Sequence, residues 1–246
     1  MTAGFTIAAG SVAGRHHVRG GRNNQDAFAF CETEAGLAAA VCDGCSSGAH
    51  SEVGARLAAM LVARSMVRDL ALRDPCEIAE RARECTLAHL EALASAMSGE
   101  GKGGARFRAV VADHFLFTVV GFALTERRAF AFALGDGVLA VDGRREVLGP
   151  FPENEPPYLG YALCAGLERA LGLEIRPLPP PSETTSLLAG TDGASELDLA
   201  PFLADERILR NPDMVRRLLW QQAKERALDD DATLVLLRRA PKGGSP

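Results

Sequence analysis

The sequence of 246 residues lacks a long uncharged apolar run and an excess of basic residues. Its most apolar stretch, residues 107–124, is interrupted by Arg108, Asp113 and His114, so we expect no transmembrane helix and no membrane partner. Lys and Arg number 27 against 32 Asp and Glu, which gives a net charge of -5. This sign argues against a protein that binds nucleic acid mainly through its phosphates.

Cysteine is also sparse, with six residues thinly spread along a chain long enough for a core of its own. This spacing is not that of a disulfide-rich secreted domain, so we expect reduced thiols and a cytoplasmic protein. The N-terminus lacks the basic start of a secretory signal and is interpreted as a first strand. Cys42 and Cys45 have no second ligand pair at zinc-finger spacing, so buried thiols are expected there rather than zinc.

Hydrophobic residues make up 47% and charged residues 24% of the chain, as in an ordinary globular protein. We find no internal repeat and no linker, and expect a single domain over residues 1–246. Two consecutive amphipathic helices are predicted, one over residues 52–70 that buries Val53 and Met60, and one over residues 74–97 that opens with an N-cap aspartate and a proline. A third helix should begin at residues 211–212 and pack the single tryptophan, Trp220.

Short apolar runs at hairpin spacing predict strands in the second half of the chain. They cover residues 107–112, 115–124, 129–134, 138–143, 186–190 and 233–239. The segment 146–186 holds too many prolines for central strands and is expected to form a surface loop region beside a site. Strands that do not alternate regularly with helices favour an α+β fold, in which antiparallel sheets are covered by helices.

Acidic residues stand at the ends of four apolar strand segments, which are three of these and residues 38–42. Asp43, Asp136 and Asp192 each stand before a glycine at the end of an apolar run, and residues 229–231 are three aspartates before the last strand. A single Asp-Gly pair usually forms only a hairpin turn, so the inference of a site depends on the acids taken together. If the strand ends converge, the carboxylates repel one another, and no Lys or Arg lies among them. A hard divalent ion, Mg²⁺ or Mn²⁺, is the simplest neutralising group.

The order of these motifs resembles the metal-dependent protein phosphatases, the type-2C serine/threonine family. The resemblance rests on six segments spread over residues 10–238, which are Asn24-Gln25-Asp26, VCDGCSSGAHSEVGA from Val41, Asp113 with FTVVG, ALGDG, LLAGTDG and DDDATLVLL. It implies a four-layer α-β-β-α sandwich of two antiparallel sheets flanked by helices. It also implies a centre of two Mn²⁺ or Mg²⁺ ions at one end of the sandwich.

Site residues follow from the resemblance by position. Asp43 would bridge the two ions, the Gly44 carbonyl would bind one of them, and Asp192 and Asp230 would complete the other. Asp26 would orient water beside the centre. Asp113 stands where we expect the acid of a third, weaker metal site.

The first motif departs from the family pattern. Gln25 stands at the position of an acid, so it brings one charge fewer to the second ion, as a carbonyl ligand or through a water. Gly21 stands at the position of the arginine that holds the substrate phosphate, a role that Arg22 or Arg15 could take over. The Gln25-Asp26 pair, with histidines before it in the sequence, is similar to the first motif of a bacterial subgroup of the family.

His16 and His17 are read first as surface or core-edge histidines, and second as a general acid for the leaving group.

The resemblance implies hydrolysis of phosphoserine or phosphothreonine in proteins by a metal-activated water, in a signalling role. Gln25 and the missing arginine keep a second hypothesis open, a catalytically weak or inactive member that binds a phosphoprotein or partner for regulation. Hydrolysis of small phosphorylated metabolites is a third.

Overall fold

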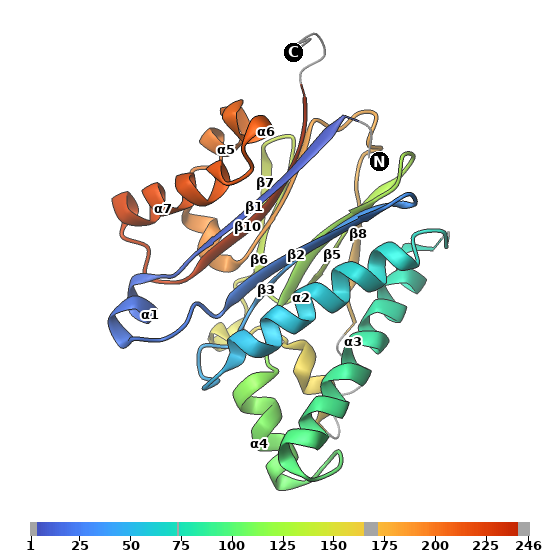
Figure 1. Cartoon of the computed structure of the whole chain (residues 1–246), viewed down its shortest axis with the longest axis vertical. Coiled ribbons are helices and arrows are strands. Elements are labelled where there is room, and N and C mark those ends of the chain that lie inside the picture. The colour runs from blue at the N-terminus through green and yellow to red at the C-terminus, as the bar shows by residue number, and fades with distance from the viewer. Residues whose placement is uncertain (1–3, 73, 165–171, 241–246) are drawn as a thin grey trace.

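The computed structural model describes residues 4–72, 74–164 and 172–240. Two five-stranded antiparallel sheets face each other, one in the order β1-β10-β9-β6-β7 and the other in the order β2-β3-β4-β5-β8. Helices cover both outer faces, as Figure 1 shows. The expected four-layer α+β sandwich is confirmed.

The first sheet is built from both ends of the chain. It contains β1 (Phe5–Val12), β10 (Ala232–Arg239), β9 (Ser186–Gly190), β6 (Gly137–Val141) and β7 (Arg144–Leu148). Its outer face packs on α5 (Ala200–Ala204), α6 (Arg207–Arg210) and α7 (Met214–Arg226) through Phe202, Ile208 and Leu219. The helix predicted from residues 211–212 thus begins at Met214, and α5 and α6 were not predicted.

The second sheet contains β2 (Asp26–Thr33), β3 (Gly36–Asp43), β4 (Val119–Leu124), β5 (Ala129–Leu134) and β8 (Glu174–Pro177). Its outer face is covered by α2 (Ser51–Arg68) and α3 (Pro75–Ser98), both predicted. The Asp74 side chain accepts a hydrogen bond of 2.9 Å from the Cys76 N–H, which is the expected N-cap. The face predicted for α2 is wrong at Val53 and Met60, which are each 40% exposed, and right at Val67, which is buried together with four alanines of the helix.

The expected strand over residues 107–112 is also wrong, since these residues lie in α4 (Ala105–His114). Phe107 and Val111 are buried four residues apart while Arg108 is exposed, a helical spacing that a six-residue apolar run does not distinguish from a strand. Trp220 is 58% exposed, with the Lys224 ammonium 5.3 Å from the centre of its ring, so it does not pack in the core.

The segment expected as a surface loop contains three short elements. They are two 3-10 turns, η1 (Pro152–Asn154) and η2 (Leu159–Leu163), and the edge strand β8. A third 3-10 turn, η3 (Asp192–Glu196), follows β9. Among the helices of the described residues, none is both long enough and apolar enough to cross a membrane. The six cysteines are free thiols, and Cys42 and Cys45 are buried.

Candidate metal centre

Apart from Asp113, the predicted site residues lie where strands of both sheets end at one end of the sandwich. In the β2-β3 hairpin, Asp26 is directly opposite Asp43. The Thr191 hydroxyl, at the end of β9 in the other sheet, donates a hydrogen bond of 2.7 Å to Asp26 Oδ2. The gathering of strand ends that the acid pattern predicted is therefore present.

The carboxylates at this end lie within electrostatic range of one another. Burial raises the pKa of Asp43 well above its usual range, and the charges of Asp26, Asp192, Asp230 and Asp136 raise it further. Burial is also the main cause that raises the pKa of Asp26 and, to about 6, the pKa of Asp192. No lysine or arginine of the described ranges forms an ion pair with any of these five carboxylates.

Asp136 belongs to this group, although only its strand-end position was noted from the sequence. It follows Gly135 just before β6, and burial together with the charge of Asp230 raises its pKa. Its Oδ1 atom is buried and has no hydrogen-bond partner among the described residues. The signal that could have identified it was present, since the Asp136-Gly137 pair ends an apolar run in the same way as Asp43-Gly44 and Asp192-Gly193.

Asp230 and Asp231 have different surroundings. Asp231 is 2% exposed, and its carboxylate accepts hydrogen bonds from the Gly14 N–H at 2.7 Å and the Gln25 N–H at 2.6 Å. The His17 Nδ1 atom lies 2.8 Å from its Oδ2 atom. Asp230 is exposed and accepts only the Asp231 N–H, at 2.8 Å, among the described contacts. Asp230 is thus free to bind a ligand, whereas Asp231 is held by protein donors.

Helix α1 (Arg15–Gly20) was not predicted, and it explains these contacts. Its first N–H groups donate to the carbonyls of Leu228 and Asp229, at 3.0 and 3.1 Å, so the helix is tied to the segment that carries the acids. A Cβ atom on Gly14 would lie 2.2 Å from the carbonyl carbon of Asp230, so only glycine allows this approach.

The positions that depart from the family pattern are occupied as follows. The Gln25 Nε2 atom donates to the Gly48 carbonyl at 3.2 Å, and its buried Oε1 atom has no partner among the described residues. Gly21 is the left-handed C-cap of α1, with a φ of 62°. Arg22 donates to the carbonyls of Ser46 and Gly48, and Arg15 to the Asp229 carboxylate, so both guanidinium groups are already engaged.

Asp113 lies apart from this network of charges. It is exposed in the last turn of α4, and its carbonyl accepts the His50 N–H at 2.8 Å. It is not among the groups that shift the pKa values of Asp26, Asp43, Asp136 or Asp192. Its role in a third metal site stays a prediction.

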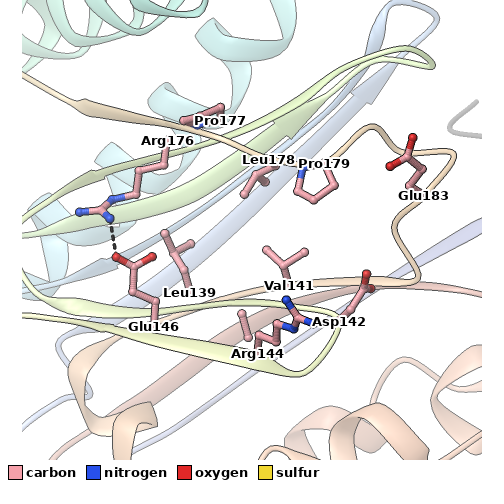
Figure 2. Close-up of a pocket in the computed structure, with 11 residues that line it drawn as sticks. Leu139, Val141, Asp142, Arg144, Glu146, Arg176, Pro177, Leu178, Pro179 and Glu183 are labelled. Carbon is pink, nitrogen blue, oxygen red and sulfur yellow. Dashed lines mark hydrogen bonds and ion pairs between the residues drawn. The ribbon is translucent and has the colours of Figure 1, made fainter.

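Two of the cavities that the described residues line bear on the position of the site. The one beside the acids has a volume of about 410 Å³ and is lined by His16, His17, Arg22, Ser46, Asp229 and Asp230. A larger one of about 620 Å³ lies between the edges of the two sheets, where the Arg176–Glu146 ion pair links β8 to β7 (Figure 2). None of the predicted site residues lines the larger cavity, so we do not assign it to the site.

These residues fit a hard divalent ion. The donors are carboxylate and amide oxygens, and two of them, Gln25 Oε1 and Asp136 Oδ1, are buried without a partner in the described part of the chain. The carboxylate oxygens of Asp43, Asp192 and Asp230 do not all lie within 4.8 Å of one another. Among the described residues, only the donor atoms of His17, Asp230 and Asp231 form a group that close. A spread set suits ions whose coordination is completed by water.

Comparison with known proteins places this arrangement in a family. The family description protein phosphatase 2C matches residues 13–232. The serine/threonine phosphatase Stp1 from Staphylococcus aureus has 16% identity and a TM-score of 0.61, with 96% of each chain covered.

Two further solved structures share this fold. The S. agalactiae serine/threonine phosphatase has 18% identity and a TM-score of 0.59, covering 96% of this chain and all of that one. The catalytic domain of the phosphatase PstP, determined with two manganese ions, has 18% identity and a TM-score of 0.54, covering 96% of this chain and 99% of its own. No curated protein sequence matches. Because the family match spans most of the chain, the chain belongs to the protein phosphatase 2C family.

Proposed function

We propose that this protein is a metal-dependent serine/threonine protein phosphatase that hydrolyses phosphomonoesters. The observation that carries the proposal is the gathering of Asp26, Asp43, Asp136, Asp192 and Asp230 at one end of the sandwich. In the described residues no basic side chain pairs with them, and the pKa values of the first four are raised. A group of acids that repel one another is stabilised by cations.

In this proposal Asp43, Asp192, Asp230, the Gly44 carbonyl and Gln25 Oε1 would hold two Mn²⁺ or Mg²⁺ ions. When bound, such ions supply an activated water and offset the charge of the phosphoryl oxygens. Because the pKa values of Asp43 and Asp192 are raised, protons compete with cations for these carboxylates.

Asp26 is placed to accept a proton or a hydrogen bond from water at the centre. The Thr191 hydroxyl occupies its Oδ2 atom, and the Asp26 N–H donates to Asn24 Oδ1 at 2.9 Å. The first contact fixes the carboxylate and the second fixes the backbone that carries it. Asp26 therefore acts as a positioning group for the attacking water.

The substrate class follows from the family, and we propose phosphoserine and phosphothreonine in proteins, in signalling. Free thiols agree with a cytoplasmic setting, and we keep the proposal of one domain over residues 1–246.

The test is hydrolysis of p-nitrophenyl phosphate and of a phosphothreonine peptide with Mn²⁺, by wild type and Asp192→Asn. Asparagine keeps the shape of the side chain but removes its charge, so we expect the rate to fall at least about 100-fold, as for the loss of a preorganised catalytic group. Asp198→Asn is the matched control, because Asp198 is exposed and its side chain accepts only the Ala200 N–H in the described contacts. Equal rates for wild type and Asp192→Asn would refute the proposal.

The positions at which a phosphate-binding arginine is expected support a second candidate function. Arg22 and Arg15 are engaged with carbonyls and with Asp229, and Gly21 has no side chain, so no free guanidinium stands at the expected place. A member of this kind would bind a phosphoprotein without turnover. It predicts that wild type shows no Mn²⁺-dependent hydrolysis while the phosphothreonine peptide binds measurably in calorimetry.

A further inference from the structure

The histidine of α1 is held in one orientation by a buried acid. The His17 Nδ1 atom lies 2.8 Å from Asp231 Oδ2, and the two side chains are 9% and 2% exposed. Asp231 Oδ2 also accepts the Gln25 N–H, and Oδ1 accepts the Gly14 N–H, which matches an ionised carboxylate that only accepts. In the tautomer that donates from Nδ1 to this carboxylate, the lone pair of the ring lies on Nε2.

This lone pair has no protein partner. Within the described ranges no hydrogen bond reaches His17 Nε2, although nine-tenths of the side chain is buried. His17 and Asp230 line the same 410 Å³ cavity. Donor atoms of His17, Asp230 and Asp231 lie within 4.8 Å of one another. A nitrogen ligand and a carboxylate thus stand together at the edge of the acidic centre.

Asp230 is the acid of this cavity that is left for a ligand. Arg22 lines the cavity, and its guanidinium donates to the carbonyls of Ser46 and Gly48. Asp229 forms an ion pair with Arg15. Asp230 forms no ion pair with a basic side chain in the described residues, so its carboxylate oxygens are available.

We propose that His17 Nε2 is a ligand of a divalent transition-metal ion that is shared with Asp230, and that Asp231 positions the imidazole ring. A carboxylate that accepts the second N–H of a ligating histidine is the usual support of such a ligand. The assignment rests on the proposed metal centre but does not require hydrolysis. Because imidazole suits Mn²⁺ and Zn²⁺ better than Mg²⁺, this ligand makes the site discriminate against Mg²⁺.

The assignment also gives a reason for the neutral residue in the first motif. Gln25 brings one charge fewer to the centre than an acid would, and His17 adds a donor at a position that Gln25 itself helps to fix, through its N–H on Asp231.

The test is pulsed electron paramagnetic resonance of the full chain loaded with Mn²⁺. Nitrogen bound to Mn²⁺ modulates the echo, and labelling the histidines with ¹⁵N changes the modulation frequency. We expect this signal in wild type and in His16→Ala, a matched control because His16 lines the same cavity but is exposed. The signal should be lost in His17→Gln, whose amide can still donate to Asp231. Mn²⁺ affinity should fall roughly tenfold or more in that variant.

Each outcome decides between the two proposals. Bound Mn²⁺ without a nitrogen signal in wild type overturns the His17 ligand and leaves the phosphatase proposal in place, and so does a signal that persists in His17→Gln. A nitrogen signal in an enzyme that hydrolyses no phosphoester overturns the phosphatase proposal alone. If Mn²⁺ does not bind at all, both are overturned.

Discussion

Two aspartates at the same end of the sandwich, the buried Asp231 and the partly buried Asp43, have opposite surroundings. Asp231, between α1 and β10, accepts hydrogen bonds from two backbone N–H groups and an imidazole. Asp43, at the end of β3, faces other carboxylates, and its pKa is raised well above the usual range. Two aspartates at the ends of strands therefore have different roles.

The comparison separates structure from function. A carboxylate whose oxygens are occupied by protein donors stabilises the fold and has little capacity left for a ligand. A carboxylate surrounded by like charges destabilises the bare protein and is stabilised by a cation. The number of protein donors on each acid, rather than its burial, distinguishes the two roles.

The largest effect is expected for Asp231→Ala, which removes the acceptor of three donors. The N–H groups of Gly14 and Gln25 and the His17 ring would be left buried and unpaired, so the free energy of unfolding should fall by roughly 3–5 kcal/mol. Urea denaturation in the presence of EDTA measures this without a contribution from metal.

A surface aspartate provides the control for this variant. Asp142 also accepts three hydrogen bonds, from the Thr185 N–H, the Thr185 hydroxyl and the Ser186 N–H, but it is exposed. Water can replace the lost acceptor, so Asp142→Ala should cost about 1 kcal/mol or less. Equal losses for the two variants would contradict the role assigned to Asp231.

A smaller effect with the opposite sign is expected for Asp192→Asn in EDTA. The pKa of Asp192 is raised to about 6 in the folded protein, so the folded state binds a proton that the unfolded state releases. The stability from this proton is complete below about pH 4 and is lost as the pH rises through 6. Asp192→Asn should therefore stabilise the metal-free protein at pH 7.5, by on the order of 2–3 kcal/mol, and leave it unchanged at pH 4.

Thermal unfolding at the two pH values, with and without Mn²⁺, measures this difference. Saturating Mn²⁺ should raise the melting temperature of wild type at pH 7.5 and should raise that of Asp192→Asn much less. A variant that is no more stable than wild type at pH 7.5 would show that Asp192 is not under electrostatic stress.

The smallest effect is expected for Gln25→Glu, which restores a charge beside the centre. The carboxylate should tighten Mn²⁺ binding about five- to tenfold in calorimetry, since it adds an anionic ligand to a site with a buried unpaired oxygen. In EDTA the same change should lower the stability, because another acid joins Asp43 and Asp26. Gln222→Glu, on α7 and away from the acids, should leave Mn²⁺ affinity unchanged. Unchanged affinity in Gln25→Glu would argue against a ligand role for this side chain.

The sequence was sufficient to predict the layers of the fold and the convergence of the acids. Asp43, Asp136 and Asp192 each end an apolar run before a glycine, and this local pattern survives in the folded chain because the strand ends meet. The N-cap at Asp74 was also readable, since it depends on adjacent residues alone.

What could not be read depends on contacts between distant residues. Helix α1 is too short to show a periodic pattern, and its first turn is held by carbonyls more than 200 residues away in the chain. Small residues, among them four alanines, make up much of the buried face of α2, so the larger side chains of Val53 and Met60 indicated the wrong side. The difference between Asp230 and Asp231 likewise required the position of Gly14, 217 residues before Asp231.

This last separation has a consequence for synthesis of the chain. Strand β1 pairs with β10, and Val12 lies opposite Ala232, so β1 cannot pair until β10 has been synthesised. A ribosome-bound chain that has not yet released residues 230–239 lacks both the partner of β1 and two of the acids. The metal-binding end is thus assembled only after residues 230–239 have been synthesised, and a product truncated before them would carry neither the complete site nor the β1-β10 pair.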